Sequence, residues 1–155
     1  MEIRIEIKPY LKAYLDIQYD YCTLNGAIRF SKNQNLYSCL LQLTTTRPKD
    51  ISWKDEGNLA LILPWPKVGK DPRIYNYMGK EHVELFEKEV EREMRMNYYR
   101  FILENKFRHG ITFLRSTQIF MEKYGMEELI KEETLIKSFY LWQNKLKKER
   151  ERNKR

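Results

Sequence analysis

The feature that most constrains this fold is an uninterrupted stretch, residues 81–107, that contains neither glycine nor proline. Its apolar residues recur at steps of three and four, which places them on one face of an α-helix. These positions are Val83, Phe86, Val90, Met94, Tyr98, Phe101 and Ile102, and the polar Asn97 falls at the same spacing. Cations and then Gly110 follow, as the C-terminus of a helix prefers. The sequence therefore predicts one long amphipathic helix.

Two shorter helices are expected after it. Residues 111–124 show helical spacing and stop at Gly125, and residues 127–130 are expected to form a helical turn. A last helix should begin at the Glu132–Glu133 pair and run into a charged tail at residues 147–155. This half of the chain is predicted to be a helical bundle that ends in a basic helix.

The N-terminal half shows a different period. Residues 2–8 alternate strictly between polar residues and isoleucine, which is typical of a half-buried strand. Pro9 ends that strand and suits the first turn of a short helix at residues 10–19. The continuous apolar run at residues 59–63 is expected to form a buried strand.

The segments between these elements are shorter and more polar. Residues 24–27 indicate a turn, followed by a short strand up to Phe30. Residues 33–43 predict a helix, for which Ser31 is the expected cap. Residues 44–58 and 67–79 contain glycine and proline and are expected to be irregular.

Together these patterns predict an α+β fold. A small N-terminal sheet with short helices, residues 1–78, should pack on a C-terminal helical bundle, residues 79–155, as two parts or one compact domain. With 42% hydrophobic and 33% charged residues, the chain can form a core. No apolar run is long enough to span a bilayer and no secretory signal is visible, so we expect a soluble cytoplasmic protein without a membrane partner. Cys22 and Cys39 are expected to be buried free thiols, and no metal or cofactor is predicted.

The net charge of +7 is concentrated at one end of the chain. Residues 137–155 hold eight cations against two carboxylates, which leaves +6 in this segment and +1 in the rest. A basic segment of this kind is typical of proteins that neutralise the phosphates of nucleic acid. The alternative is a solvated helix end, in which cations favour the C-terminus.

The last two helices also have the outline of a helix-turn-helix. Residues 116–124 would form the supporting helix, Gly125 the turn, and residues 129–146 the helix that enters the major groove. Lys131 stands where a tight motif has an apolar residue, so the turn is expected to be longer than the tight version. The glutamates around it would repel phosphate, and a plain helical hairpin remains an alternative. Expected phosphate contacts are Lys137, Lys145, Lys147, Lys148, Arg150 and Arg152, and expected base contacts are Ser138, Gln143 and Asn144.

Residues 113–150, about a quarter of the chain, resemble the C-terminal part of small DNA-binding proteins of bacterial phages and mobile elements. The resemblance rests on the Tyr-Gly turn, the Glu-Thr-Leu-Ile-Lys start of the last helix and the Phe139-Tyr140 pair before a basic end. It implies sequence-directed DNA binding, with a role in regulating transcription or element mobility. The leading prediction is therefore a non-catalytic DNA-binding protein, with RNA as the other nucleic-acid partner.

Two other function classes stay open. An interaction or assembly module would use the outer face of residues 81–107 to bind a protein partner or a second copy of the chain. A metal-dependent nuclease would bring Asp50, Asp55 and Asp71 together around a magnesium ion. His82 and His109 form no catalytic motif. The aromatic segments 75–77 and 98–100 could stack bases, or simply pack in the core.

Overall fold

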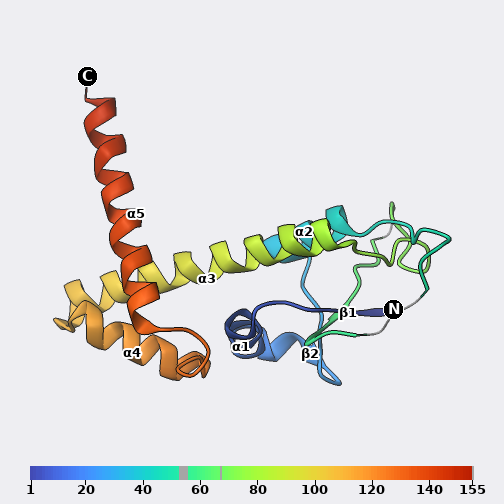
Figure 1. Cartoon of the computed structure of the whole chain (residues 1–155), viewed down its shortest axis with the longest axis horizontal. Helices are drawn as coiled ribbons and strands as arrows, with labels where there is room; N and C mark the ends of the chain where they lie inside the picture. Colours follow the sequence, from blue (N-terminus) through green and yellow to red (C-terminus); the bar gives the residue numbers. More distant parts are fainter. Residues whose placement is uncertain (53–55, 67, 155) are drawn as a thin grey trace. The chain divides into compact units, whose positions relative to one another are not determined.

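The computed structural model describes residues 1–52, 56–66 and 68–154. The fold is α+β, with a small sheet in the N-terminal part and a helical C-terminal part, as the sequence predicted (Figure 1). The chain forms two compact units, Met1–Met94 and Arg95–Arg155. Their boundary lies inside the long helix α3 (Lys80–His109), whereas the sequence placed it before that helix. The difference arises because each half of α3 contributes buried side chains to its own unit.

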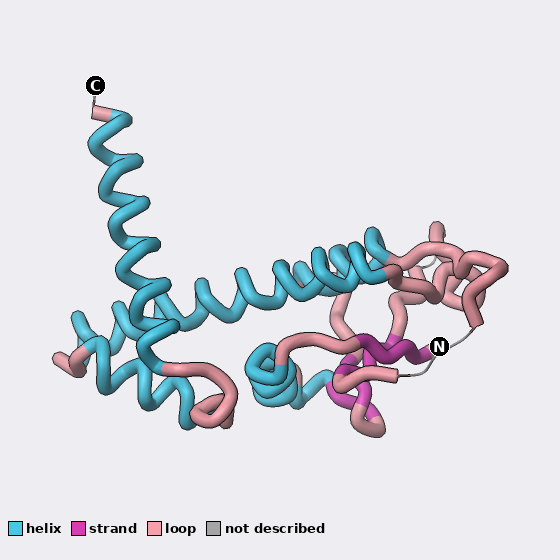
Figure 2. The backbone as a smooth tube through the Cα atoms, in the orientation of Figure 1, coloured by secondary structure: helices cyan, strands magenta, loops and turns pink. Residues whose placement is uncertain are grey.

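The strands of the first unit are magenta in Figure 2. They form a four-stranded sheet with the order β1-β4-β3-β2. Its strands are β1 (Glu2–Ile5), β2 (Thr23–Leu24), β3 (Ala27–Ile28) and β4 (Leu59–Ile62). Strand β4 pairs antiparallel with β1 and parallel with β3, and Leu61 lies opposite both Ile3 and Ile28. Leu61 is fully buried, so β4 is the apolar centre of the sheet. The alternation expected for β1 is confirmed, because Ile3, Ile5 and Ile7 are all buried.

Strands β2 and β3 form a tight hairpin. Its two turn residues, Asn25 and Gly26, have φ values of 54° and 82°. Two consecutive positive φ angles match the twist of a two-residue hairpin and favour asparagine followed by glycine. The predicted turn is therefore confirmed, and the strand expected up to Phe30 is shorter than predicted.

Two helices and a 3-10 turn connect the strands of this unit: α1 (Pro9–Gln18), η1 (Asp20–Cys22) and α2 (Asn35–Leu43). Pro9 opens α1, as predicted. Ser31 does not cap α2, which is a correction. The N-cap position is Gln34, and its side-chain oxygen accepts the backbone N–H of Ser31 at 2.7 Å. The chain therefore folds back one turn before the helix starts.

Tyrosine hydroxyls hold the first half of α3 against α1. Tyr14 and Tyr19 donate to the two carboxylate oxygens of Glu93, at 2.9 and 2.6 Å. Tyr10 and Lys8 donate to Glu91, two residues earlier on α3. These glutamates lie beside the apolar face of α3 and give the buried phenols an acceptor, which burial of a polar group requires.

The second unit contains the end of α3 with α4 (Phe113–Tyr124) and α5 (Glu132–Asn153). Its core is aromatic and includes Tyr98, Phe120 and Phe139, each at most 1% exposed. Tyr98 exchanges a hydrogen bond of 2.7 Å with Thr117 on α4. The predicted helices are confirmed, and α5 continues as helix through the charged tail to Asn153.

Within the described residues, no helix combines the length and the apolar composition needed to cross a membrane.

Candidate nucleic-acid interface

The turn between α4 and α5 is built from residues that fix both helix ends. Thr112 caps α4 by accepting the backbone N–H of Arg115 at 3.2 Å. Gly125 ends α4 in the left-handed conformation, with φ 63°. The next residue, Met126, is fully buried and its N–H donates to the carbonyl of Met121 at 3.0 Å. The chain therefore leaves α4 along a defined path.

This turn is longer than a tight helix-turn-helix connection, as expected from the position of Lys131. The seven residues Gly125–Lys131 separate α4 from α5, and Lys131 is exposed at the N-cap of α5. Met126 and Leu135 are fully buried and take the packing role on either side of it. Ile130, the residue before Lys131, is half-buried.

The first half of α5 is held by packing against α3. Phe139 is fully buried, and the Trp142 ring stacks on Tyr99 with a centroid separation of 4.7 Å and an interplanar angle of 20°. The Tyr99 hydroxyl lies 3.2 Å from the Ser138 hydroxyl, to which it donates. Ser138 in turn donates to the carbonyl of Leu135 at 2.8 Å. Its hydroxyl is therefore engaged inside the unit, and we leave Ser138 out of the interface.

The remaining predicted contact residues lie along α5. All six expected phosphate contacts are exposed: Lys137, Lys145, Lys147, Lys148, Arg150 and Arg152. Asn144 is exposed and Gln143 is half-buried. Within the described residues, none of the six cations forms an ion pair or a hydrogen bond through its side chain. Their charge is therefore available to a ligand.

The helical spacing decides which of these residues share a face. Lys137, Asn144 and Lys148 are separated by seven and four residues, so they lie on one stripe opposite the buried Phe139. Lys145 and Arg152 flank this stripe on one side, and the other side holds Lys147. At 1.5 Å per residue, the cations from Lys137 to Arg152 extend over roughly 22 Å of helix. That length matches several phosphate spacings of a nucleic-acid backbone.

The two ends of α5 carry opposite charge. Glu132 and Glu133 occupy the first turn, and Arg150 and Arg152 lie in the last. This arrangement favours the helix because it complements the helix dipole. It also limits phosphate contacts to the later turns, because carboxylates at the first turn repel an anion.

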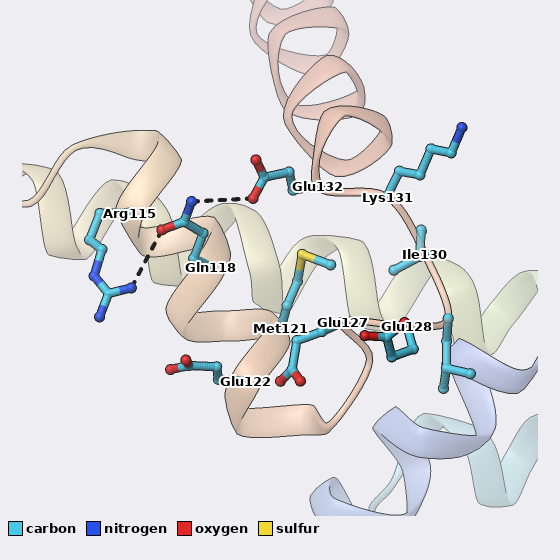
Figure 3. A pocket seen from close by; sticks show the side chains of 10 residues that line it. Arg115, Gln118, Met121, Glu122, Glu127, Glu128, Ile130, Lys131 and Glu132 are labelled. Atoms are coloured by element: carbon cyan, nitrogen blue, oxygen red, sulfur yellow. Dashed lines mark hydrogen bonds between the residues drawn. The ribbon is translucent and has the colours of Figure 1, made fainter.

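A cavity of about 620 Å³ lies beside the start of α5, and its lining is also rich in carboxylates (Figure 3). Met121 and Ile130 contribute apolar surface, while Glu122, Glu127, Glu128 and Glu132 contribute carboxylates. Figure 3 shows Gln118 between Arg115 and Glu132, with a hydrogen bond to each. Four carboxylates against two cations, Arg115 and Lys131, make this lining unfavourable for a phosphate.

An aromatic flank was missed by the sequence reasoning. Tyr140 follows the buried Phe139 directly and is 48% exposed. Its ring lies 6.4 Å from that of Phe113, and the ammonium of Lys106 lies 5.8 Å from the Phe113 ring centroid. The sequence contained a signal for this exposure. Phe139 and Trp142 are three residues apart and mark the packed face of the helix, so Tyr140 lies to one side of that face.

The nuclease alternative finds no metal site in the described part of the chain. No group of three or more His, Cys, Asp or Glu there could hold a metal ion. The Asp71 carboxylate accepts hydrogen bonds from Arg73, which lowers the pKa of that carboxyl. Asp50 lies exposed in a loop, and Asp55 lies outside the described residues. The Nδ1 atom of His82 is 2.9 Å from the carbonyl oxygen of Leu43, a contact that ties α3 to the end of α2.

Other candidate residues serve packing. Tyr98 and Tyr99 are buried and do not present their rings to a base. Cys22 and Cys39 are free thiols, as expected, but both are half-buried rather than fully buried. Partial burial raises the pKa of Cys39 to about 11, so this thiol is a weak nucleophile at neutral pH.

Comparisons with protein-family models, with curated proteins and with solved structures found no match to this chain. The functional assignment therefore depends on the geometry described above.

Proposed function

We propose that this protein binds nucleic acid, with DNA as the preferred partner, through the exposed cations of α5. The phosphate contacts are Lys137, Lys145, Lys147, Lys148, Arg150 and Arg152. The protein has no catalytic role in this proposal.

One observation supports it above the others: these six exposed cations have no partner of their own within the described residues. Cations whose role is structural usually hold a carboxylate or a carbonyl. Unpaired cations distributed around the exposed turns of a helix whose first turns are packed are suited to displace counterions from a phosphate backbone.

Sequence reading would come from the same stripe. Asn144 lies between Lys137 and Lys148, where an amide can pair with the edge of adenine while its neighbours contact phosphate. Gln143, which is half-buried, lies at the margin of the stripe. The likeness of residues 113–150 to DNA-binding proteins of phages and mobile elements extends the proposal to a regulatory role in such an element.

The test is charge reversal at Lys147 and Lys148. The double variant Lys147→Glu/Lys148→Glu should weaken binding to a fluorescent random DNA duplex about tenfold or more at low salt. The slope of log affinity against log salt should become shallower by the equivalent of about two phosphate contacts. The loss of affinity should be similar for all DNA sequences. Fluorescence anisotropy across a salt series measures both quantities, with an RNA duplex and a single strand as further arms.

The matched control reverses two exposed, unpaired lysines of the N-terminal unit, Lys49→Glu/Lys88→Glu. It changes the net charge equally and should alter the affinity far less. Equal loss in both variants would mean that net charge alone governs binding and would reject the interface. Circular dichroism should show the same helical content in all three proteins.

A protein-interaction module is the second candidate, and the exposed side of α3 bears on it. Leu85, Met96 and Phe107 are 47%, 42% and 79% exposed. They are separated by polar residues such as Glu89 and Arg100, so they do not form one contiguous apolar patch. This candidate predicts self-association, which light scattering would detect, and no loss of partner binding on reversal of Lys147 and Lys148.

A further inference from the structure

A second cavity lies in the N-terminal unit, at the end of the sheet where two parallel strands finish. Its volume is about 420 Å³, within the range of small-ligand sites. Residues 29–32, which follow β3, and residues 62–65, which end and follow β4, form its walls together with Tyr37 of α2. Because β3 and β4 run parallel, this is the carboxyl edge at which open sheets with parallel strands bind ligands.

The cavity combines apolar walls with two free cations. Phe30 and Leu63 are buried at its base, each 5% exposed. Arg29 and Lys32 are exposed at its rim, and their side chains have no ion pair or hydrogen bond in the described residues. None of the described residues that line the cavity is acidic. The lining therefore suits a ligand with an apolar body and an anionic group.

Trp65 lines this cavity, and its ring contacts a cation that does not line it. The indole is 62% exposed. The guanidinium of Arg73 lies 5.3 Å from the Trp65 ring centroid, although Arg73 does not line the cavity. Asp71 holds that guanidinium with hydrogen bonds of 2.7 to 3.1 Å. A tryptophan held in this way can stack an aromatic ring at little cost in side-chain entropy.

We propose that this cavity binds a nucleotide. The base stacks on Trp65 and packs against the apolar walls, and the phosphate lies between Arg29 and Lys32. The ligand chemistry is a base that carries a phosphate, whether as a free mononucleotide or as the 5′ end of a strand. This site is separate from the α5 interface and does not depend on it.

The experiment titrates the full chain, labelled with ¹⁵N, with AMP and follows the indole N–H signal of Trp65. The Trp65→Phe variant identifies that signal by its loss. A saturable shift is expected, and the variant Arg29→Ala/Lys32→Ala should weaken AMP binding at least about tenfold. The control Lys49→Ala/Lys80→Ala removes the same charge away from the cavity and should change the affinity less than about twofold.

Two further probes separate the contributions of base and phosphate. Adenosine lacks the phosphate and inorganic phosphate lacks the base, so each should bind at least about tenfold more weakly than AMP. Adenosine binding as tightly as AMP, or phosphate alone competing equally well, would overturn the assignment. So would the absence of saturation at about 10 mM AMP, or equal losses in the cavity variant and its control.

The outcome can be told apart from that of the α5 proposal. Lys147→Glu/Lys148→Glu should bind AMP with unchanged affinity, and a loss there would place AMP on α5 and overturn the cavity site. A 5′-phosphorylated trinucleotide shows whether the ligand is a free mononucleotide or the 5′ end of a strand. Tighter binding than AMP indicates the end of a strand, weaker binding indicates the free nucleotide, and both results support a site for a base with its phosphate.

Discussion

The two units use their charged side chains differently. In the N-terminal unit, Lys70 donates to the carbonyls of Leu41 and Thr44 at the end of α2, at 2.8 Å each, and Arg73 is bound by Asp71. In the C-terminal unit, the cations of α5 extend into solvent without partners in the described chain.

This difference indicates which charges have a structural role. A lysine that satisfies helix carbonyls stabilises the fold. Cations that donate to no acceptor of the protein contribute little to folding, and their charge is available to an anionic ligand. Arg29 and Lys32 of the N-terminal unit are unpaired in the same way, and they differ from unpaired lysines such as Lys49 in that they line a cavity.

The largest effect is expected at Gly57, where the N-terminal unit requires close backbone contact. Its φ of 147° is one that L-residues rarely adopt, and a Cβ there would overlap the backbone of Ile5. Gly57→Ala should therefore separate β1 from the segment before β4 and lower the free energy of unfolding by at least about 3 kcal/mol. Urea denaturation measures the loss.

The control for this change is Gly26→Ala in the hairpin. It also has a positive φ, 82°, but nothing lies within 4 Å of its Cβ. It should cost about 1 kcal/mol. Equal losses at the two glycines would mean that the positive φ, and not the close contact with Ile5, makes glycine necessary at position 57.

An intermediate effect is expected from pH, because each unit has a buried tyrosine with a raised pKa. Burial raises the pKa of Tyr98 from 10.0 to about 12. At Tyr19, burial and the Glu93 carboxylate both raise the pKa. In the unfolded chain both phenols ionise near the ordinary value. The stabilisation is therefore present below pH 10 and is lost as pH rises above 10, between pH 10 and about 12 for Tyr98.

The loss at Tyr98 should be roughly 1 kcal/mol at pH 11, because that pH lies about one unit above the ordinary pKa and one unit below the folded-state value. Denaturation at pH 8 and pH 11 measures it. Tyr98→Phe should flatten the pH dependence of the C-terminal unit, and Glu93→Gln should reduce that of the N-terminal unit. Equal stability at both pH values would contradict the prediction.

Local periodicity predicted much of the fold. The alternation at residues 2–8 predicted β1, and the three-and-four spacing at residues 81–107 predicted α3 within a few residues. These signals are strong because one side of each element is buried over its whole length. The Asn25-Gly26 turn was visible for a different reason, since both residues tolerate positive φ.

Nonlocal features could not be predicted in this way. The parallel pairing of β3 with β4 joins strands that lie far apart in the sequence, and with it comes the cavity beneath Trp65. The engagement of Ser138 by Tyr99 depends on how α5 packs on α3. A helical pattern shows that Ser138 borders the apolar face but does not show which partner it meets.

The division into units was also hidden from the sequence. A continuous helix has no break in its pattern. The boundary between the units, at Met94 and Arg95, falls inside α3, which contains no glycine or proline. Composition changes near residue 79, where the helix starts, and that is the boundary a reading of composition finds.

The smallest effect is expected at Gly125, the counterpart of Gly57 in the C-terminal unit. Its φ is 63°, but nothing lies within 4 Å of a Cβ built there. Gly125→Ala therefore costs only the strain of a left-handed alanine, about 1 kcal/mol, and Gly125→Asn should cost less because asparagine tolerates that conformation. Thermal or urea unfolding measures both, and neither change should alter DNA affinity, because the cations of α5 are untouched. If Asn proved as costly as Ala, or if either variant lost DNA binding while folded, the Gly125 turn would contribute to binding itself, and the separation between structural and binding residues in this unit would not hold.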